Sequence, residues 1–185
     1  MTTTSIIISG FGGQGTLFAG QVLAYTALDN DLQVTWIPSY GPEMRGGTAR
    51  CTIIIADQEI GSPVVNTPDV AIVMNLPSLD KYETKMRPGG VLVANSSLIN
   101  RDLGRTDLNS VFLPANEIAE KIGNPRLANM VMLGGMLELL PVLTLEQVKQ
   151  GLSEHIPERH KNTLSLNYEA MEKGAALAQE YKVLV

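Results

Sequence analysis

Residues Ser5–Thr16 read SIIISGFGGQGT, and this stretch decides the fold. Its β-branched apolar run, Ile6–Ile8, is typical of a central strand that is covered on both faces. The run leads into the glycine-rich turn Gly10–Gly15, and residues 16–28 then carry small and apolar side chains at helical spacing. A buried strand, a tight turn and a helix in this order indicate the first βα unit of a layered α/β fold.

Outward from this unit, strands and helices alternate until the chain becomes helical. Runs of β-branched and apolar residues between turn formers predict strands at 34–37, 49–56, 70–74, 91–94 and 111–113. Helical patterns predict helices at 77–86, 117–122, 127–140, 145–154 and 163–181. Asp57-Gln58-Glu59 is interpreted as a hairpin turn into Ile60, which would add an antiparallel element. We therefore predict one domain over residues 1–185, a three-layer α/β/α fold with a mostly parallel, mixed sheet and a helical C-terminal third.

Composition and net charge limit the classes of partner that this chain can bind. The chain has 185 residues, of which 44% are hydrophobic and 18% charged, and its net charge is -5. This charge leaves no basic stripe for nucleic acid or an anionic membrane, and no long apolar run or positively charged leader appears. We expect a cytoplasmic protein with neither partner. The low charge also predicts apolar surface that a partner subunit, or a homodimer of the isolated chain, would cover.

The turn Gly10–Gly15 matches G-x-G-x-x-G between a strand and a helix, where backbone N–H groups can hold an anion. Gly12, Gly13 and Gln14 are its candidate contact residues. A dinucleotide site would also need a carboxylate after the second strand, and none stands there, which argues against an NAD-dependent enzyme. The alternative is that the glycines serve only a tight turn and close packing.

A second candidate segment follows the second predicted strand. It combines turn formers, one guanidinium and two adjacent glycines, and its residues are Tyr40, Gly41, Pro42, Glu43, Met44, Arg45, Gly46 and Gly47. Such a loop can bring bare backbone and one positive charge close to another surface. The alternative is a rigid connection in which Arg45 pairs with Glu43 or Glu59.

Other polar residues give weaker indications. Asn95 and Ser96 follow a predicted strand at its carboxyl end, where open α/β sheets bind ligands, but they could equally cap the next turn. Cys51, the one cysteine, is predicted to be a buried apolar residue and cannot alone hold a cluster or zinc. His155 and His160 are predicted to lie on the surface, and no metal site or catalytic residue is assigned in this chain.

Taken together, these motifs resemble the gamma subunit of 2-oxoacid:ferredoxin oxidoreductases, over nearly the whole chain. The residues that carry the resemblance are Gly10–Gly15 with Ala19-Gly20, Tyr40–Gly47, Pro68-Asp69, Asp80-Lys81-Tyr82, Pro88-Gly89-Gly90, Asn95-Ser96-Ser97, Gly123-Asn124 and Asn129-Met130. The similarity is greatest to the type that uses 2-oxoglutarate or branched-chain oxoacids, in which this domain is a separate polypeptide.

The resemblance implies a complex that oxidatively decarboxylates a 2-oxoacid to acyl-CoA and CO2 and reduces ferredoxin. It implies alpha and beta partner subunits, and possibly a ferredoxin-like delta subunit, that carry thiamine pyrophosphate, Mg2+ and 4Fe-4S clusters. It also implies that this chain covers the active site and receives coenzyme A as co-substrate, with no cofactor of its own. The alternative is a standalone regulatory module that binds a nucleotide or coenzyme A.

Overall fold

The computed structural model describes residues 3–41 and 47–183. It contains one sheet with the strand order β2-β3-β1-β4-β5-β6. The strands are β1 (Thr3–Phe11), β2 (Gln33–Tyr40), β3 (Thr48–Ala56), β4 (Val70–Val73), β5 (Val91–Asn95) and β6 (Asn109–Leu113). Strand β3 runs opposite to the other five strands, so the prediction of a mostly parallel, mixed sheet is confirmed.

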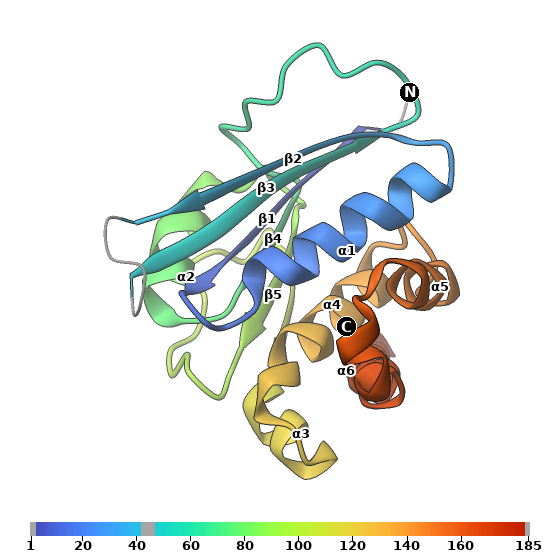
Figure 1. The fold of residues 1–185 in the computed structure, drawn as a ribbon. Coiled ribbons are helices and arrows are strands. Elements are labelled where there is room, and N and C mark those ends of the chain that lie inside the picture. The colour runs from blue at the N-terminus through green and yellow to red at the C-terminus, as the bar shows by residue number, and fades with distance from the viewer. Residues whose placement is uncertain (1–2, 42–46, 184–185) are drawn as a thin grey trace.

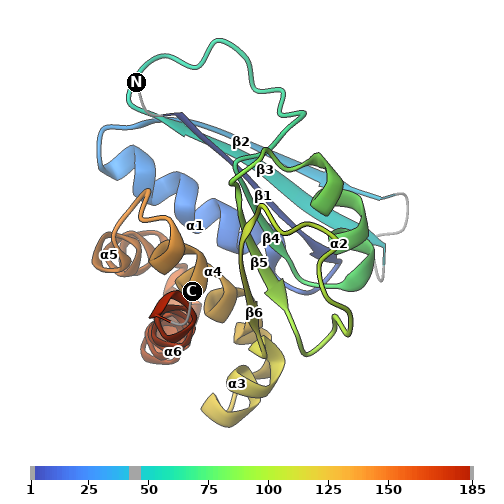
Figure 2. The same cartoon turned by 180° about the vertical axis from the view of Figure 1, so that it is seen from behind.

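Helices cover the two faces of the sheet unequally. The α-helices are α1 (Thr16–Asp29), α2 (Leu76–Tyr82), α3 (Ala115–Ile122), α4 (Ala128–Leu139), α5 (Leu145–His155) and α6 (Leu164–Val183). Short 3₁₀ turns are η1 (Glu83–Lys85), η2 (Pro125–Leu127) and η3 (Glu158–Thr163). Figure 1 shows α1, α4, α5 and α6 on one face, and Figure 2 shows α2 on the other. The three layers and the helical C-terminal third are as predicted.

Alternation along β1 divides the core between these faces. Ile6 and Ile8 join the large cluster beneath α1, α4 and α6, whereas Ile7 joins the smaller cluster beneath α2. Successive side chains of a strand point to opposite faces, and both faces of β1 are covered. This arrangement explains why the run Ile6–Ile8 is apolar without a break.

The predicted hairpin at Asp57-Gln58-Glu59 is wrong. Residues 57–69 form an irregular connection with no strand at Ile60. The reason is that β3 already pairs with β1 along one edge and with β2 along the other, so no free edge remains for a returning strand. The antiparallel element exists, but it is β3 itself.

Strand β2 is longer than predicted and lies at the edge of the sheet. It runs through Pro38, which is opposite Cys51. Proline has no N–H to donate, and an edge strand tolerates it because one side has no neighbouring strand. Across residues 3–41 and 47–183, no helix has the length and apolar character needed to cross a membrane.

Helices α4 and α6 approach each other through glycine. A Cβ atom added at Gly134 would overlap the backbone of Met171, and one added at Gly174 would overlap the backbone of Val131. The close approach of α4 and α6 therefore requires glycine at these two positions. The contact closes the large core on the side away from the sheet (Figure 1).

We expect Gly134→Ala to lower the free energy of unfolding by about 2 kcal/mol, because overpacking outweighs the better helix propensity of alanine. Gly61→Ala is the control, since a Cβ there meets nothing within 4 Å, and it should stay within about 0.5 kcal/mol of the parent. Urea unfolding measures both. Equal midpoints for the two variants would contradict the packing explanation.

Candidate functional site

The two glycine segments singled out in the sequence meet at the carboxyl edge of β1. The Gly12 N–H donates to the Gly47 carbonyl over 2.9 Å, and the Gly41 N–H donates to the Thr48 carbonyl over 2.7 Å. Because β3 is antiparallel to β1, Phe11 lies opposite Thr48, and the segment before β3 arrives where β1 ends. Pro42, Glu43, Met44, Arg45 and Gly46, also candidate residues, lie outside the described residues.

The backbone of the first turn depends on glycine at two positions. Gly13 has φ of 96° and Gly15 has φ of 74°, values that side chains disfavour. Gly15 is the N-cap of α1, and within residues 3–41 and 47–183 no side chain caps this end of the helix. No side chain of these residues therefore occupies the first N–H groups of α1, which lie at the end of the helix where the dipole is positive.

Gln14 braces the turn from within. Its Oε1 accepts the Phe11 N–H over 2.6 Å and the Asn75 Nδ2 amide over 3.3 Å. Asn75 in turn caps α2 by accepting the Ser78 N–H over 3.0 Å. The side-chain oxygen of Gln14 is thus engaged inside the chain. Asn75 was not among the candidates, although its place directly after a buried strand is the same signal that selected Asn95.

Of the two roles considered for Asn95, ligand binding and capping of a turn, the structure shows the capping role. It is fully buried, at 0% exposure. Its Nδ2 donates to the Met74 carbonyl and to Asn116 Oδ1, and its Oδ1 accepts the N–H groups of Ser97 and Ala115. The Asn95 side chain therefore caps the turns that follow β5 and β6. Ser96 is half-buried and donates its N–H to the Leu113 carbonyl.

Asn129 fastens α4 to the glycine turn. Its Nδ2 donates to the Gly15 carbonyl over 3.0 Å, and the residue is 4% exposed. A side chain added at Gly15 would collide with this amide. This role of Asn129 does not follow from the sequence, since nothing in the local pattern indicates a partner 114 positions away.

A cavity of about 310 Å³ opens beside the turn. It lies between the N-terminal end of α1, the η2 turn and the start of α6, and its walls include Gly13, Gly15, Arg126, His160 and Asn167. Among the residues that the structure describes, no carboxylate lines it. The cavity therefore presents backbone donors, a guanidinium and an imidazole, a donor set suited to phosphate or carboxylate.

Tyr40 is the last residue of β2, at the same edge of the sheet, and is 62% exposed. Phe11, at the end of β1, is 38% exposed. Both positions are at the end of the sheet where Gly12 meets Gly47. Two exposed aromatic rings beside bare backbone form a surface that a ligand arm or a partner subunit would cover.

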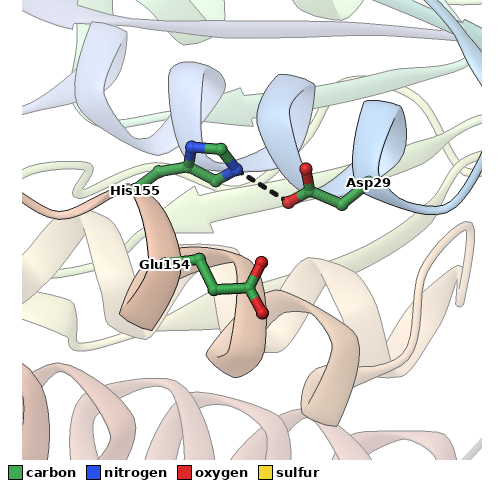
Figure 3. A group of neighbouring side chains, drawn as sticks. All are labelled: Asp29, Glu154 and His155. Carbon is green, nitrogen blue, oxygen red and sulfur yellow. Dashed lines mark hydrogen bonds and ion pairs between the residues drawn. The ribbon is translucent and has the colours of Figure 1, made fainter.

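Asp29, Glu154 and His155 form a separate group at the far end of α1 (Figure 3). One potential ligand atom from each lies within 4.8 Å of the others. His155 Nε2 is hydrogen-bonded to Asp29 Oδ2 over 2.8 Å, and its ring stacks on Tyr25 with centroids 4.6 Å apart. All three residues are exposed, and these contacts fasten the end of α5 to α1. The geometry gives the group a structural role.

Both histidines are exposed, as the sequence predicted. Cys51 is fully buried at 0% exposure, again as predicted. Burial raises the pKa of the Cys51 thiol from 9.0 to about 12. The thiol is therefore protonated at neutral pH and is neither a nucleophile nor a metal ligand.

The fold and the site together define an α/β domain with a glycine-rich turn at the carboxyl edge of its sheet. The chain belongs to the pyruvate ferredoxin/flavodoxin oxidoreductase family, whose model matches residues 5–177. The resemblance inferred from the motifs is thus confirmed at the level of the family.

Named relatives contain this domain both within longer chains and as a separate chain. The chain is 38% identical to the ketoisovalerate oxidoreductase subunit VorA of Methanothermobacter thermautotrophicus over 94% of its own length, but spans 36% of that subunit. It is 34% identical to the 2-oxoglutarate synthase subunit KorC of Methanocaldococcus jannaschii, covering 95% of this chain and 94% of that one.

A solved structure agrees with the second arrangement. The keto/oxoacid ferredoxin oxidoreductase gamma subunit from Geobacter sulfurreducens superposes with a TM-score of 0.84 at 27% identity. The superposition covers 97% of this chain and 98% of that one.

The buried thiol provides a test of the core beneath α1. In the folded chain at pH 8, Cys51 should resist alkylation, whereas in concentrated urea it should react fully, because only the unfolded thiol ionises near that pH. As the pH rises, the Cys51 thiol loses its proton in the unfolded chain before it does so in the folded chain. The contribution of this thiol to the free energy of unfolding is therefore complete below about pH 9 and is lost as the pH rises toward about 12. Mass spectrometry of alkylated protein measures the difference. Equal labelling rates in the two states would show that the thiol is accessible.

Proposed function

We propose that this chain is the gamma subunit of a cytoplasmic 2-oxoacid:ferredoxin oxidoreductase, with 2-oxoglutarate as the favoured substrate. In the overall reaction, the bond to the carboxylate breaks with loss of CO2, the coenzyme A sulfur takes the acyl group as a thioester, and the released electrons reduce ferredoxin. The likeness to the KorC subunit along the full length of both chains supports the separate-subunit arrangement and this substrate.

The redox and thiamine chemistry is assigned to partner chains. A 4Fe-4S cluster takes four cysteine thiolates, and this chain has one cysteine, which is buried. We therefore assign thiamine pyrophosphate, Mg2+ and the clusters to the partner subunits: alpha, beta and a ferredoxin-like delta subunit. The contribution of this chain is binding, orientation and exclusion of water, which accelerate a reaction without a catalytic group.

One observation carries the proposed role. The Gly12–Gly47 hydrogen bond brings the two glycine segments together at the sheet edge, next to a cavity with guanidinium and backbone donors. Coenzyme A is a polyanion with a largely apolar arm, so its capture needs phosphate donors and a slot with little steric hindrance. We propose that this edge receives coenzyme A and covers the active site formed by the partners.

The edge strand β2 supplies a surface for those partners. Ile37 is 42% exposed and Tyr40 is 62% exposed, although both have large hydrophobic side chains. An edge strand with exposed apolar residues favours association. In the complex we propose that the alpha or beta subunit covers it, and in the isolated chain a second copy does so.

The alternative is a standalone module that binds a nucleotide or coenzyme A, and the donors that line the cavity beside Gly13 are compatible with it. Affinity purification from native cells separates the two. A gamma subunit should co-purify with thiamine-bearing and iron-sulfur chains and be required for acyl-CoA formation. A monomeric chain that binds coenzyme A alone and associates with neither would establish the alternative.

Arg45 provides the sharper test of the covering role. In the assembled complex, we expect Arg45→Ala to lower kcat/KM for coenzyme A about tenfold or to weaken assembly, because a charge-assisted contact is lost. Arg45→Lys should recover part of the loss, since it keeps the charge without the two-pronged geometry. The control is Lys121→Ala, an exposed cation on α3. Unchanged kinetics and unchanged assembly in Arg45→Ala would refute the assignment.

A further inference from the structure

The group formed by Asp29, Glu154 and His155 combines the donor types of a metal site. One potential ligand atom from each residue lies within 4.8 Å of the others (Figure 3). Two carboxylates and an imidazole are ligands that bind zinc and the neighbouring transition metals in proteins. The three side chains come from α1 and α5, so the packing of these two helices brings them together.

The spacing of the three ligand atoms is close to that around a single ion. Zinc bonds of about 2.0–2.2 Å keep any two ligand atoms of one ion within about 4.3 Å of each other. His155 Nε2 and Asp29 Oδ2 are 2.8 Å apart, and an ion between them would widen this contact to about 3.4 Å, as at a tetrahedral centre. The other separations, of at most 4.8 Å, need only small rotations of exposed side chains.

The ring of His155 is held in the orientation that such a site needs. It stacks on Tyr25, with centroids 4.6 Å apart and 18° between the ring planes. One face of the imidazole is thus occupied, while Nε2, at the ring edge, points toward Asp29 (Figure 3). A ligand whose ring is already fixed loses little freedom when it binds an ion.

The two carboxylates of the group lack a basic partner. Within residues 3–41 and 47–183, neither Asp29 nor Glu154 forms an ion pair with a lysine or an arginine. In contrast, Lys149 on the same helix α5 pairs with both Glu146 and Glu172, over 2.8 and 2.6 Å. Two carboxylates this close disfavour each other's charge, and a bound cation would remove this repulsion.

Both helices also direct the negative ends of their dipoles to this place. Helix α1 ends at Asp29, and its last turn contains no basic residue. Helix α5 ends at His155. A helix C-terminus is equivalent to about half a negative charge. The two helix ends therefore add to the field of the two carboxylates, and the sum favours a cation.

We propose that Asp29, Glu154 and His155 bind a divalent transition-metal ion of the Zn2+ class at the junction of α1 and α5. The imidazole selects such ions over Mg2+ and Ca2+, which prefer sites made of oxygen ligands alone. The site lies at the opposite end of α1 from the glycine turn. The ion is structural, and it strengthens the contact that fastens α5 to α1.

Isothermal titration calorimetry of the full chain with ZnCl2, without a histidine tag, tests the site. We expect one ion for each chain. His155→Gln and Glu154→Gln should each raise Kd for Zn2+ about tenfold or more, because each removes one of three ligands. The matched controls are His160→Gln and Glu120→Gln, which change an exposed histidine beyond α5 and an exposed glutamate on α3. Both should leave Kd unchanged, and an excess of Mg2+ should not displace the zinc.

Glu154→Gln separates a metal site from a simple contact between helices. Glu154 accepts a hydrogen bond from Gln150 of its own helix, over 2.9 Å. The variant therefore keeps the contact between His155 and Asp29, and without metal it should unfold at the wild-type temperature. Zn2+ should raise Tm of the wild type but not of Glu154→Gln, because an ion that binds only the folded chain stabilises it.

The inference is overturned if Glu154→Gln binds Zn2+ as tightly as the wild type, whether or not His155→Gln folds. Loss of binding in His160→Gln would overturn it as well, and so would displacement of the zinc by Mg2+, since the imidazole would then not be a ligand. None of these results bears on the proposed function, because no measurement depends on acyl-CoA formation.

Discussion

The antiparallel pairing of β3 with β1 is the constraint on which the rest of the structure depends. Five strands run in one direction. A segment that enters a strand parallel to β1 would arrive at the edge of the sheet where β1 begins, not where it ends. Because β3 alone is reversed, the segment before it arrives where β1 ends, with Thr48 opposite Phe11. Two glycine segments far apart in sequence can then share the Gly12–Gly47 hydrogen bond. A fully parallel sheet would have separated them by the length of a strand.

The helical layer completes the site from the other side. Asn129 joins α4 to the carbonyl of Gly15, and the α4–α6 contact at Gly134 and Gly174 fixes where the start of α6 lies. The glycine turn, η2 and η3 are thereby held around one cavity. Residues that make the core compact thus also determine the shape of this cavity, and a loosened helix contact would change it at Gly13, more than 100 residues away in sequence.

The sequence could predict those features of the fold that depend on local patterns, but not those that depend on contacts between residues far apart in the chain. The apolar runs of β1, β4 and β5 identify buried strands because burial on both faces requires them, and the pattern of residues 16–28 is sufficient for α1. The error at Asp57 arose because the local turn signal is real, whereas the occupancy of both edges of β3 is a long-range property. Likewise, the local position of Asn95 suggested a ligand site, but its burial depends on α3. Arg126 and His160 belong to the site only through tertiary packing, so no local motif could identify them.

The proposed contact between an acidic chain and the polyanion coenzyme A requires positive groups at the place of contact. With a net charge of -5, the average surface repels coenzyme A, so attraction has to be local and positioned. The cavity beside Gly13 contains one such group, Arg126. Within the described residues, Arg126 forms no ion pair with a carboxylate, whereas Arg87, Arg101 and Arg105 each do. Arginine suits phosphate better than lysine, because its planar fork matches phosphate and loses less freedom for each hydrogen bond formed.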